Sequence, residues 1–254
     1  LPSSRTDVLL LYFNPKPKIQ NPKFLMPLFR LSHELAFPPP SLSLPDGLLA
    51  VGGDLSVERL LLAYRSGIFP WYSEGDPILW WSPDPRMLLF LDEFHLSKRL
   101  ERTITQGVFD VRMDTAFEKV IAACASARGP KRDSTWITGE MREAYCRLHR
   151  EGYAHSVETW QDGELAGGLY GVSLGACFFG ESMFSRVPNA SKVAAAALVR
   201  HVARWKFPFI DCQLHNAHLA SLGAREVPRS TFLDMLQRNV VKESRRGAWV
   251  FEGW

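Results

Sequence analysis

The stretch AHSVETWQDGELAGGLYGVSLGACFFGESMF, residues 154–184, decides the fold that we expect for this chain. It contains three runs of residues that suit strands, separated by the short segments Gln161-Asp162-Gly163 and Ser173-Leu174-Gly175. Segments of this length and composition form tight turns between neighbouring strands. The stretch therefore predicts an antiparallel meander with strands at 154–160, 164–172 and 176–184.

The segments after the meander predict a helix and then a buried strand. The Ala-rich sequence NASKVAAAALVRHVARW, residues 189–205, has helical composition, with Asn189 or Ser191 as its N-cap. The apolar run FPFIDCQ, residues 207–213, predicts the strand. A strand, a helix and a second strand beside a meander favour a mixed sheet with a parallel crossover at its end. Further helices are expected at 114–126, 139–152, 215–224 and 230–239.

This predicted sheet, splayed where the helix begins, is similar to the acetyltransferase-like (GNAT-like) architecture. We therefore expect an α+β chain with a GNAT-like mixed-sheet domain over residues 96–254. The sequence before it, residues 26–95, is expected to form a small N-terminal α/β domain. Residues 1–25 are rich in Pro and Lys and lack clear periodicity, and we expect them to be a disordered extension.

The expected N-terminal domain combines a short helix with an unusually aromatic segment. Ser56 is a suitable N-cap for the helix and Gly67 a suitable residue to end it. The segment FPWYSEGDPILWWSPDPR, residues 69–86, follows directly, and its prolines exclude one continuous helix. So many rings must either pack in a core or line a pocket for a flat, apolar group. RMLLFL, residues 86–91, then predicts a buried strand.

Composition and charge exclude several classes of protein. Apolar residues make up 46% of the 254 residues and the formal charge is only +3, so a nucleic-acid site would have to be a local patch. The longest apolar run near the start, residues 8–13, is far shorter than the ~20 residues of a membrane span, and no signal-peptide cleavage site follows it. The four cysteines match no zinc pattern, and His215 and His218 have no further ligand at suitable spacing. We therefore expect a cytoplasmic protein with no metal.

Two polar clusters interrupt otherwise buried strands. One contains Glu181, and the other contains Asp211 and Gln213. Residues i and i+2 of a regular strand share a face, so Asp211 and Gln213 are expected to point the same way at a strand end, where open sheets bind ligands. The structural alternative is that Asp211 caps the following helix and Gln213 lies on the surface.

Five stretches resemble the signature sequences of leucyl/phenylalanyl-tRNA–protein transferases. The resemblance covers residues 30–240, and it departs from the family at residues 1–25 and at the basic segment 127–135. Its most specific part is the long aromatic motif. The stretches are GLLAVGGDLS, GIFPWYSEGDPILWWSPDPR, GESMFSR, NASK, and IDCQ together with Asn216, His218 and the SLGA sequence that come after it.

The resemblance implies an activity and its partners. Such an enzyme transfers Leu, Phe or, less well, Met from aminoacyl-tRNA to the N-terminal α-amino group of a protein that begins with Arg or Lys. The added residue marks that protein for N-degron proteolysis. The family uses no metal and no organic cofactor. We expect a monomer that does not bind membranes.

The resemblance also implies roles for single residues. Gln213 would accept a hydrogen bond from the attacking amine, Asp211 would orient Gln213, and Glu181 would orient the aminoacyl end. The 3′-terminal adenosine and its aminoacyl group would be held by Tyr64, Trp71 and Tyr145, with Trp71 stacked on adenine. Trp80 and Trp81 are expected to pack in the core and hold the aromatic segment. Candidates for the apolar side-chain pocket, each equally consistent with plain core, are Leu169, Phe178, Met183 and Ile210.

The body of the tRNA requires a local basic surface because the net charge is small. Arg200 and Arg204 are four residues apart on one predicted helix and so share a face. We select this pair, together with Lys98 and Arg99, as expected tRNA contacts. The four candidate clusters are Lys98, Arg99 and Arg102; Arg128, Lys131 and Arg132; Arg200, Arg204 and Lys206; and Lys242, Arg245 and Arg246.

Three other functions are compatible with parts of the pattern. A coenzyme-A-dependent acyltransferase is disfavoured because the turn before the Ala-rich helix, SRVPNASK, has no glycine to approach a pyrophosphate. A non-catalytic RNA-binding module would leave Asp211 and Gln213 without a role. A transferase that uses aminoacyl-tRNA on cell-wall precursors would share the donor and the fold, but the aromatic motif argues against it.

Overall fold

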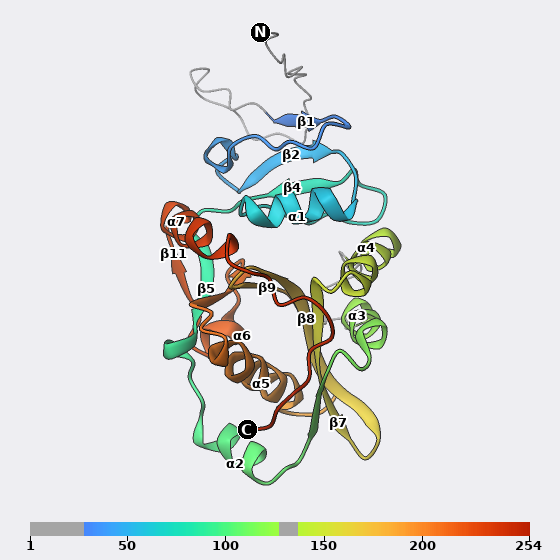
Figure 1. Ribbon diagram of the computed structural model, residues 1–254, viewed down its shortest axis with the longest axis vertical. Coiled ribbons are helices and arrows are strands. Elements are labelled where there is room, and N and C mark those ends of the chain that lie inside the picture. Colours follow the sequence, from blue (N-terminus) through green and yellow to red (C-terminus); the bar gives the residue numbers. More distant parts are fainter. Residues whose placement is uncertain (1–27, 127–136) are drawn as a thin grey trace, which may run out of the picture.

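The computed structural model describes residues 28–126 and 137–254, which form two sheets and the helices around them (Figure 1). The first sheet has four strands and the second has seven. The expected α+β class with a mixed sheet is confirmed. The predictions made for residues 1–25 and for Arg128, Lys131 and Arg132 lie outside the described residues. No helix within the described ranges is long and apolar enough to cross a membrane.

The small sheet has the strand order β1-β2-β4-β3 and is covered by α1 (Val57–Arg65). As the sequence predicts, the helix begins at Ser56, whose side chain accepts a hydrogen bond from the backbone N–H of Arg59. A 3-10 turn lies between the first two strands, at Pro40–Leu42. The four strands are β1 (Phe29–Leu31), β2 (Leu48–Gly52), β3 (Phe69–Pro70) and β4 (Leu79–Trp81).

The aromatic segment forms β3 and β4 and supplies the core of this sheet. Trp80 is fully buried, and its indole N–H donates to the carbonyl of Gly52 at 2.9 Å. The indole N–H of Trp81 donates to the carbonyl of Trp71 at 2.7 Å, and the two rings lie 5.5 Å apart. Trp80 therefore packs in the core, as predicted, while Trp81 fixes the position of Trp71.

The large sheet has the strand order β11-β5-β10-β9-β8-β7-β6. Its centre is the predicted antiparallel meander, and β10 pairs in parallel with β9 and antiparallel with β5. The connection between β9 and β10 is α5 (Ala190–Arg204), which is the predicted crossover. The strands are β5 (Arg86–Phe90), β6 (Asp110–Met113), β7 (Ala154–Gln161), β8 (Glu164–Leu174), β9 (Cys177–Ser185), β10 (Phe209–Gln213) and β11 (Arg225–Val227).

Helices cover both faces of the large sheet. On one face α3 (Phe117–Ser126) and α4 (Gly139–Arg150) pack in the same core as Tyr170 and Phe179, whereas α5 packs on the other face with Leu169 and Phe178. This alternation follows from the two-residue period of β8 and β9. The remaining helical segments are α2 (Lys98–Thr105), α6 (Ala217–Ala220), α7 (Arg229–Val240) and a 3-10 turn at Leu91–Glu93.

The boundary between the two sheets differs from the boundary predicted near residue 95. β5, which we placed in the N-terminal domain, pairs with β10 and β11 in the large sheet. The small sheet ends with β4 at Trp81. A buried apolar run such as β5 fits either sheet by composition, so its partner strands could not be read from the sequence.

The start of α5 also differs from the prediction. Asn189 occupies the N-cap position, but its backbone is left-handed with φ 71° and its side chain makes no capping hydrogen bond. Instead, the hydroxyl of Ser185, at the end of β9, accepts the backbone N–H of Ser191 at 3.3 Å. The strand before the helix therefore supplies a cap that a local sequence rule does not anticipate.

Candidate active site

The cavity that contains the predicted site opens where β9 and β10 separate. The two strands pair at only two positions, Ile210 with Phe178 and Asp211 with Phe179. Beyond them β9 stays paired with β8 as far as Ser185, whereas β10 ends at Gln213. The resulting gap is a cavity of about 700 Å³. The predicted splay of the sheet thus creates the site.

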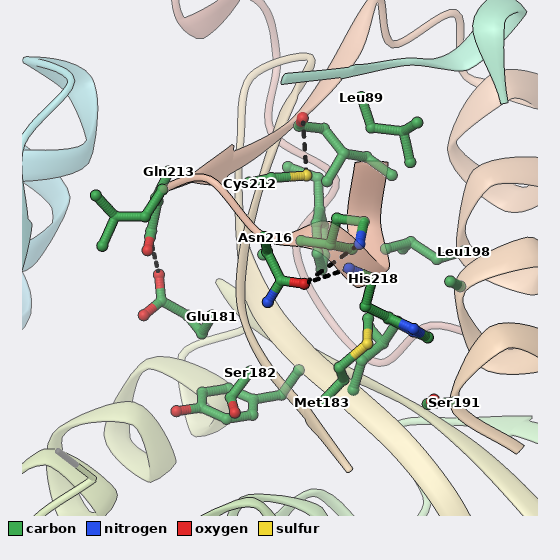
Figure 2. Close-up of a pocket in the computed structure, with 18 of the residues that line it drawn as sticks. Leu89, Glu181, Ser182, Met183, Ser191, Leu198, Cys212, Gln213, Asn216 and His218 are labelled. Carbon is green, nitrogen blue, oxygen red and sulfur yellow. Dashed lines mark hydrogen bonds between the residues drawn. The ribbon is translucent and has the colours of Figure 1, made fainter. Parts of the chain in front are cut away.

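Glu181 and Gln213 form a polar wall of the cavity, and the apolar side chains of Leu169, Phe178, Met183 and Leu198 form an apolar wall that also includes Ser191, Asn216 and His218. Figure 2 shows the hydrogen bond between Glu181 and Gln213 on one side, with Leu198 of α5 across from it. Trp71, which is 37% exposed, also lines the cavity. The structure brings to this cavity all four residues predicted for the apolar pocket, which are Leu169, Phe178, Met183 and Ile210.

Three predicted site residues do not line the cavity but lie behind its polar wall. Asp211, Tyr64 and Tyr145 are each 0% exposed. Tyr64 comes from α1 and Tyr145 from α4, so helices that precede the meander support residues within it and after it. Their contacts are with Gln213 and Glu181, described next.

Asp211 is held by an arginine that the sequence analysis did not single out. Arg86, the first residue of β5, donates from Nε and Nη2 to the two carboxylate oxygens of Asp211, at 2.8 and 2.7 Å. Both side chains are at most 1% exposed. The guanidinium also donates to the carbonyl of Gly67 and lies over the rings of Phe69 and Phe232, at 4.9 and 4.6 Å from their centres. The sequence did contain a signal for this contact, because Arg86 is a charged residue at the start of an otherwise apolar strand.

The predicted geometry of Asp211 and Gln213 is wrong because β10 contains a bulge between them. Asp211 lies opposite Leu88 of β5, and Gln213 lies opposite Met87, the adjacent residue. Two residues of β10 thus span one step of its partner, which breaks the i, i+2 relation. Gln213 has a φ of 64°, and Asp211 accepts its backbone N–H at 2.9 Å. Asp211 therefore fixes the main chain of Gln213.

The structural alternative for Asp211 and Gln213 is also wrong. The helix after β10 is capped by Asn216, whose side-chain oxygen accepts the backbone N–H groups of His218 and Leu219. Gln213 is only 8% exposed and is therefore not a surface residue. Both residues belong to the buried framework of the cavity.

Glu181 anchors the other end of Gln213. The side-chain amide nitrogen of Gln213 donates to Oε1 of Glu181 at 2.9 Å. Because this nitrogen faces the carboxyl group, the amide carbonyl oxygen is turned away from Glu181 and remains the acceptor end of the side chain. Gln213 is thus held at its backbone by Asp211 and at its side chain by Glu181.

Glu181, Tyr64 and Tyr145 form a closed triangle of oxygen atoms. Tyr64 lies 2.7 Å from Oε1 of Glu181, Tyr145 lies 2.8 Å from Oε2, and the two hydroxyls lie 2.5 Å apart. Each tyrosine brings one proton, so two protons must serve three oxygen–oxygen contacts. If Glu181 carries a proton, three protons serve the three contacts, and each group donates once and accepts once within the triangle.

Electrostatics favours the same additional proton. Burial raises the pKa of the Glu181 carboxyl to about 7, although its hydrogen-bond donors lower it, and the nearby carboxylate of Asp211 raises it further. Burial also raises the pKa of both Tyr64 and Tyr145 well above the usual value, and Glu181 adds to the shift. The tyrosines therefore stay protonated, and Glu181 is the member of the triangle that titrates near neutrality.

The residues selected for tRNA binding lie away from this cavity. Arg204 donates to the carboxylate of Glu252 at 2.9 Å and to the carbonyl of Gly253 at 3.0 Å, so its charge is engaged by the C-terminal segment. Arg200 follows the cavity residue Ser191 by nine positions, which places it about 180° around the helix. The other two selected residues are exposed on α2: Lys98 and Arg99.

Comparison with known sequences assigns the chain to a family. The profile described as "Leucyl/phenylalanyl-tRNA protein transferase" matches residues 88–237, and that of the N-terminal domain of the same family matches residues 53–84. The chain belongs to the leucyl/phenylalanyl-tRNA protein transferase family. Membership makes it an aminoacyltransferase, so a module that only binds RNA is not supported. Tyr64 and Trp71 lie in the shorter match, and Glu181, Asp211 and Gln213 lie in the longer one.

Relatives in this family are similar over nearly their whole length. The leucyl/phenylalanyl-tRNA–protein transferase of Desulfatibacillum aliphaticivorans is 60% identical over 227 residues, which cover 89% of this chain and 97% of that protein. The enzyme of the same name from Syntrophobacter fumaroxidans is 58% identical over 224 residues, or 88% of this chain and 96% of that protein. Among solved structures, L-PGS from Bacillus licheniformis gives a TM-score of 0.35 at 12% identity, over 66% of this chain and 54% of that chain.

Arg86→Met is expected to lower the free energy of unfolding by about 3–5 kcal/mol, because it leaves the carboxylate of Asp211 buried without a counter-charge. Adding Asp211→Asn should restore part of the loss, since a neutral amide needs no counter-charge. Arg225→Met is the matched control, because Arg225 makes the same two-bond contact with Glu93 but at the surface, where the side chains are 51% and 41% exposed. Denaturant titration should show a control loss below about 1 kcal/mol, and equal losses in the two variants would contradict the account.

Glu181→Gln is expected to keep the fold and to remove a pH dependence of stability. Glutamine, like a neutral carboxyl group, can donate once and accept through its oxygen. In the wild type the folded-state pKa of Glu181 is about 7, which exceeds the ordinary 4.5. The stability that the protonated side chain contributes is therefore fully present below pH 4.5 and is lost as pH rises through about 7. The loss should be on the order of 3 kcal/mol.

Unfolding measured by denaturant at a series of pH values tests this. Infrared spectra of the wild type near pH 6 should also contain a protonated-carboxyl C=O band that the variant lacks. A variant that is destabilised at every pH, with no change in that band, would show that Glu181 is an anion accepting three hydrogen bonds.

Proposed function

We propose that this chain transfers Leu, Phe or, less well, Met from aminoacyl-tRNA to the α-amino group of proteins that begin with Arg or Lys, marking them for N-degron proteolysis. The observation that carries the proposal is the cavity at the splayed strands, which joins an apolar wall to a rigidly held glutamine. Family membership supports the same donor, because the relatives are named for leucyl- and phenylalanyl-tRNA.

The apolar wall suits a fairly large donor side chain that is not branched at Cβ. Leu169 and Phe178 are almost fully buried, and the flexible Met183 lies beside them. A thioether side chain adapts to differently shaped apolar groups, which fits acceptance of Leu, Phe and Met. A side chain branched at Cβ would be disfavoured by shape, although a single methyl group discriminates by only about 1–3 kcal/mol.

Trp71 is placed to stack on the terminal adenine of the donor. It combines partial exposure at the cavity with a fixed position, since its carbonyl accepts from Trp81 and its ring packs on that residue. Stacking of a base on an aromatic ring contributes about 1–3 kcal/mol and does not depend on base identity. The adenosine would thus be held at the rim, with the aminoacyl group inside the cavity.

The reaction is the direct aminolysis of an activated ester. The neutral amine attacks the ester carbonyl carbon, a C–N bond forms, and the C–O bond to the 3′-oxygen of the adenosine breaks. The nitrogen loses one proton and the leaving oxygen gains one. A typical α-amine has a pKa of about 8, so part of it is neutral at pH 7 without a strong base. Positioning of the two reactants can supply as much as about 7–11 kcal/mol of the acceleration.

Gln213 is the residue that we assign to the attacking amine. Its amide carbonyl would accept a hydrogen bond from the amine and direct the nitrogen lone pair at the ester. Asp211 acts on it through the backbone, and Glu181 acts on it through the side-chain amide. Tyr64 and Tyr145 act one step further away, by holding Glu181. We assign Asp211, Glu181, Tyr64 and Tyr145 as positioning residues. We place the enzyme in the cytoplasm, because the donor and the acceptors are cytoplasmic molecules, and we expect it to act as a monomer.

The direct test uses Phe-tRNA labelled on its amino acid. Incubated with the enzyme and a protein that begins with Arg, the label should move to the N-terminus of that protein. The same protein beginning with Ala serves as the control and should stay unlabelled. Label on neither protein would refute the proposed reaction, and equal label on both would refute the specificity for basic N-termini.

Gln213→Ala is expected to lower kcat and kcat/KM together, by about 100-fold or more, because it removes a contact used mainly in the transition state. Gln106→Ala, at an exposed position after α2, is the control and should leave both constants unchanged. Steady-state rates over a range of donor concentrations separate the two constants. A Gln213 variant with normal kcat and a raised KM would make Gln213 a donor-binding residue instead.

Trp71→Ala is expected to raise KM on the order of tenfold to a hundredfold, as loss of one stacked base implies. The increase should be the same for full aminoacyl-tRNA and for a minimal aminoacyl-adenosine. Trp254→Ala is a control of similar exposure, because Trp254 is 39% exposed and Trp71 is 37% exposed. An effect limited to full tRNA would place Trp71 against the tRNA body and overturn the stacking assignment.

A further inference from the structure

A second hollow lies beside the active-site cavity. It has a volume of about 430 Å³ and is open to the surface. It is formed by the outer turns of α3, the turn between β7 and β8, and the residue that follows β9. Its lining consists of Lys119, Ala122, Ala123, Ser126, Trp160, Gly163, Glu164, Leu165 and Arg186.

The two hollows are neighbours along one extended segment. Ser185 lines the cavity and the next residue, Arg186, lines the second hollow. The backbone N–H of Arg186 donates to the carbonyl of Ala166, so this segment still follows β8. From Glu181 to Arg186 an extended chain covers about 17 Å. A few nucleotides span that distance, since stacked nucleotides advance by about 3.4 Å each.

The charges of the second hollow suit a phosphate backbone. Lys119 and Arg186 are exposed, and the only acidic residue among the described residues that line it is Glu164. The ammonium group of Lys119 lies 5.9 Å from the ring centre of Trp160, which forms part of the wall. The guanidinium of Arg186 lies over Phe184 and donates to the carbonyl of Leu165, so its position in the lining of the second hollow is held by two contacts. Cations beside aromatic rings are typical of sites for single-stranded nucleic acid.

We propose that the second hollow binds the single-stranded 3′ end of the donor RNA, immediately 5′ of the adenosine at the cavity. This inference rests on the proposed function. Arg186 and Lys119 neutralise phosphates there, and no base is read, because donors on different tRNAs must be accepted. Arg186 directly follows a residue that lines the cavity, whereas Arg200 lies about 180° around α5 from the cavity residue Ser191.

The test uses Phe joined by a stable amide to the 3′ end of RNAs of increasing length, from a mononucleotide to a tetranucleotide. Binding to the wild type should tighten with each added nucleotide. Lys119→Ala combined with Arg186→Ala should bind the mononucleotide normally and lose the gain with length. It should also flatten the plot of log affinity against log salt for the tetranucleotide by about 1.4 units, as expected for two single-strand phosphates. Arg65→Ala combined with Arg238→Ala removes the same charge at two exposed positions outside the hollow and should behave as the wild type.

Each other result would overturn the inference. A wild-type affinity that does not depend on length, or a gain that survives in the Lys119 and Arg186 variant, would exclude the second hollow as the RNA path. Loss of the gain in the Arg65 and Arg238 control would show that overall charge, and not the second hollow, produces the dependence on length. Failure of the wild type to bind even the mononucleotide would refute the proposed function itself, and this inference with it.

Discussion

The buried ion pair between Arg86 and Asp211 is the contact on which the rest of the site depends. It joins β5 to β10 within the large sheet, and through the carbonyl of Gly67 it also reaches the turn after α1. Two charges taken out of water are stable only when each is well paired, and the two-bond contact provides that pairing. Oδ1 of Asp211, which accepts from Nε of Arg86, also accepts the backbone N–H of Gln213, and this contact stabilises the bulge at the end of β10.

The bulge at the end of β10 gives Gln213 a fixed position. Gln213 follows the bulge and lines the cavity, where its side-chain amide donates to Glu181 on the neighbouring strand. Glu181 is in turn held by tyrosines from α1 and α4. The reacting region is therefore preorganised by elements from both sheets, which suits a reaction that depends on position more than on acid–base strength.

The sequence predicted the parts of this structure that local rules control. Runs of strand-forming residues separated by tight turns located the meander, and the Ala-rich segment located α5. Glu181, Asp211 and Gln213 were identified because polar residues at the ends of buried strands are unusual. Family resemblance added Tyr64, Trp71 and Tyr145, and it did not indicate that both tyrosines lie buried behind the cavity.

The features that the sequence did not predict depend on contacts between distant residues. The bulge requires Asp211 to meet Arg86, which is 125 positions away in the chain. The strand β5 could not be assigned to a sheet without knowing its partner strands. The cap of α5 comes from Ser185, six residues before the position that it caps. In each case the short-range pattern was compatible with more than one arrangement, and tertiary packing chose between them.

A double-mutant cycle on kcat tests most directly whether Asp211 acts through Gln213. The four proteins are the wild type, Asp211→Asn, Gln213→Ala and the double variant, each assayed at a temperature where all are folded. If Asp211 serves only to position Gln213, Asp211→Asn should slow the wild type strongly and have almost no further effect once Gln213 is alanine. Independent, additive losses in the two backgrounds would contradict the account and would assign Asp211 its own part in the chemistry.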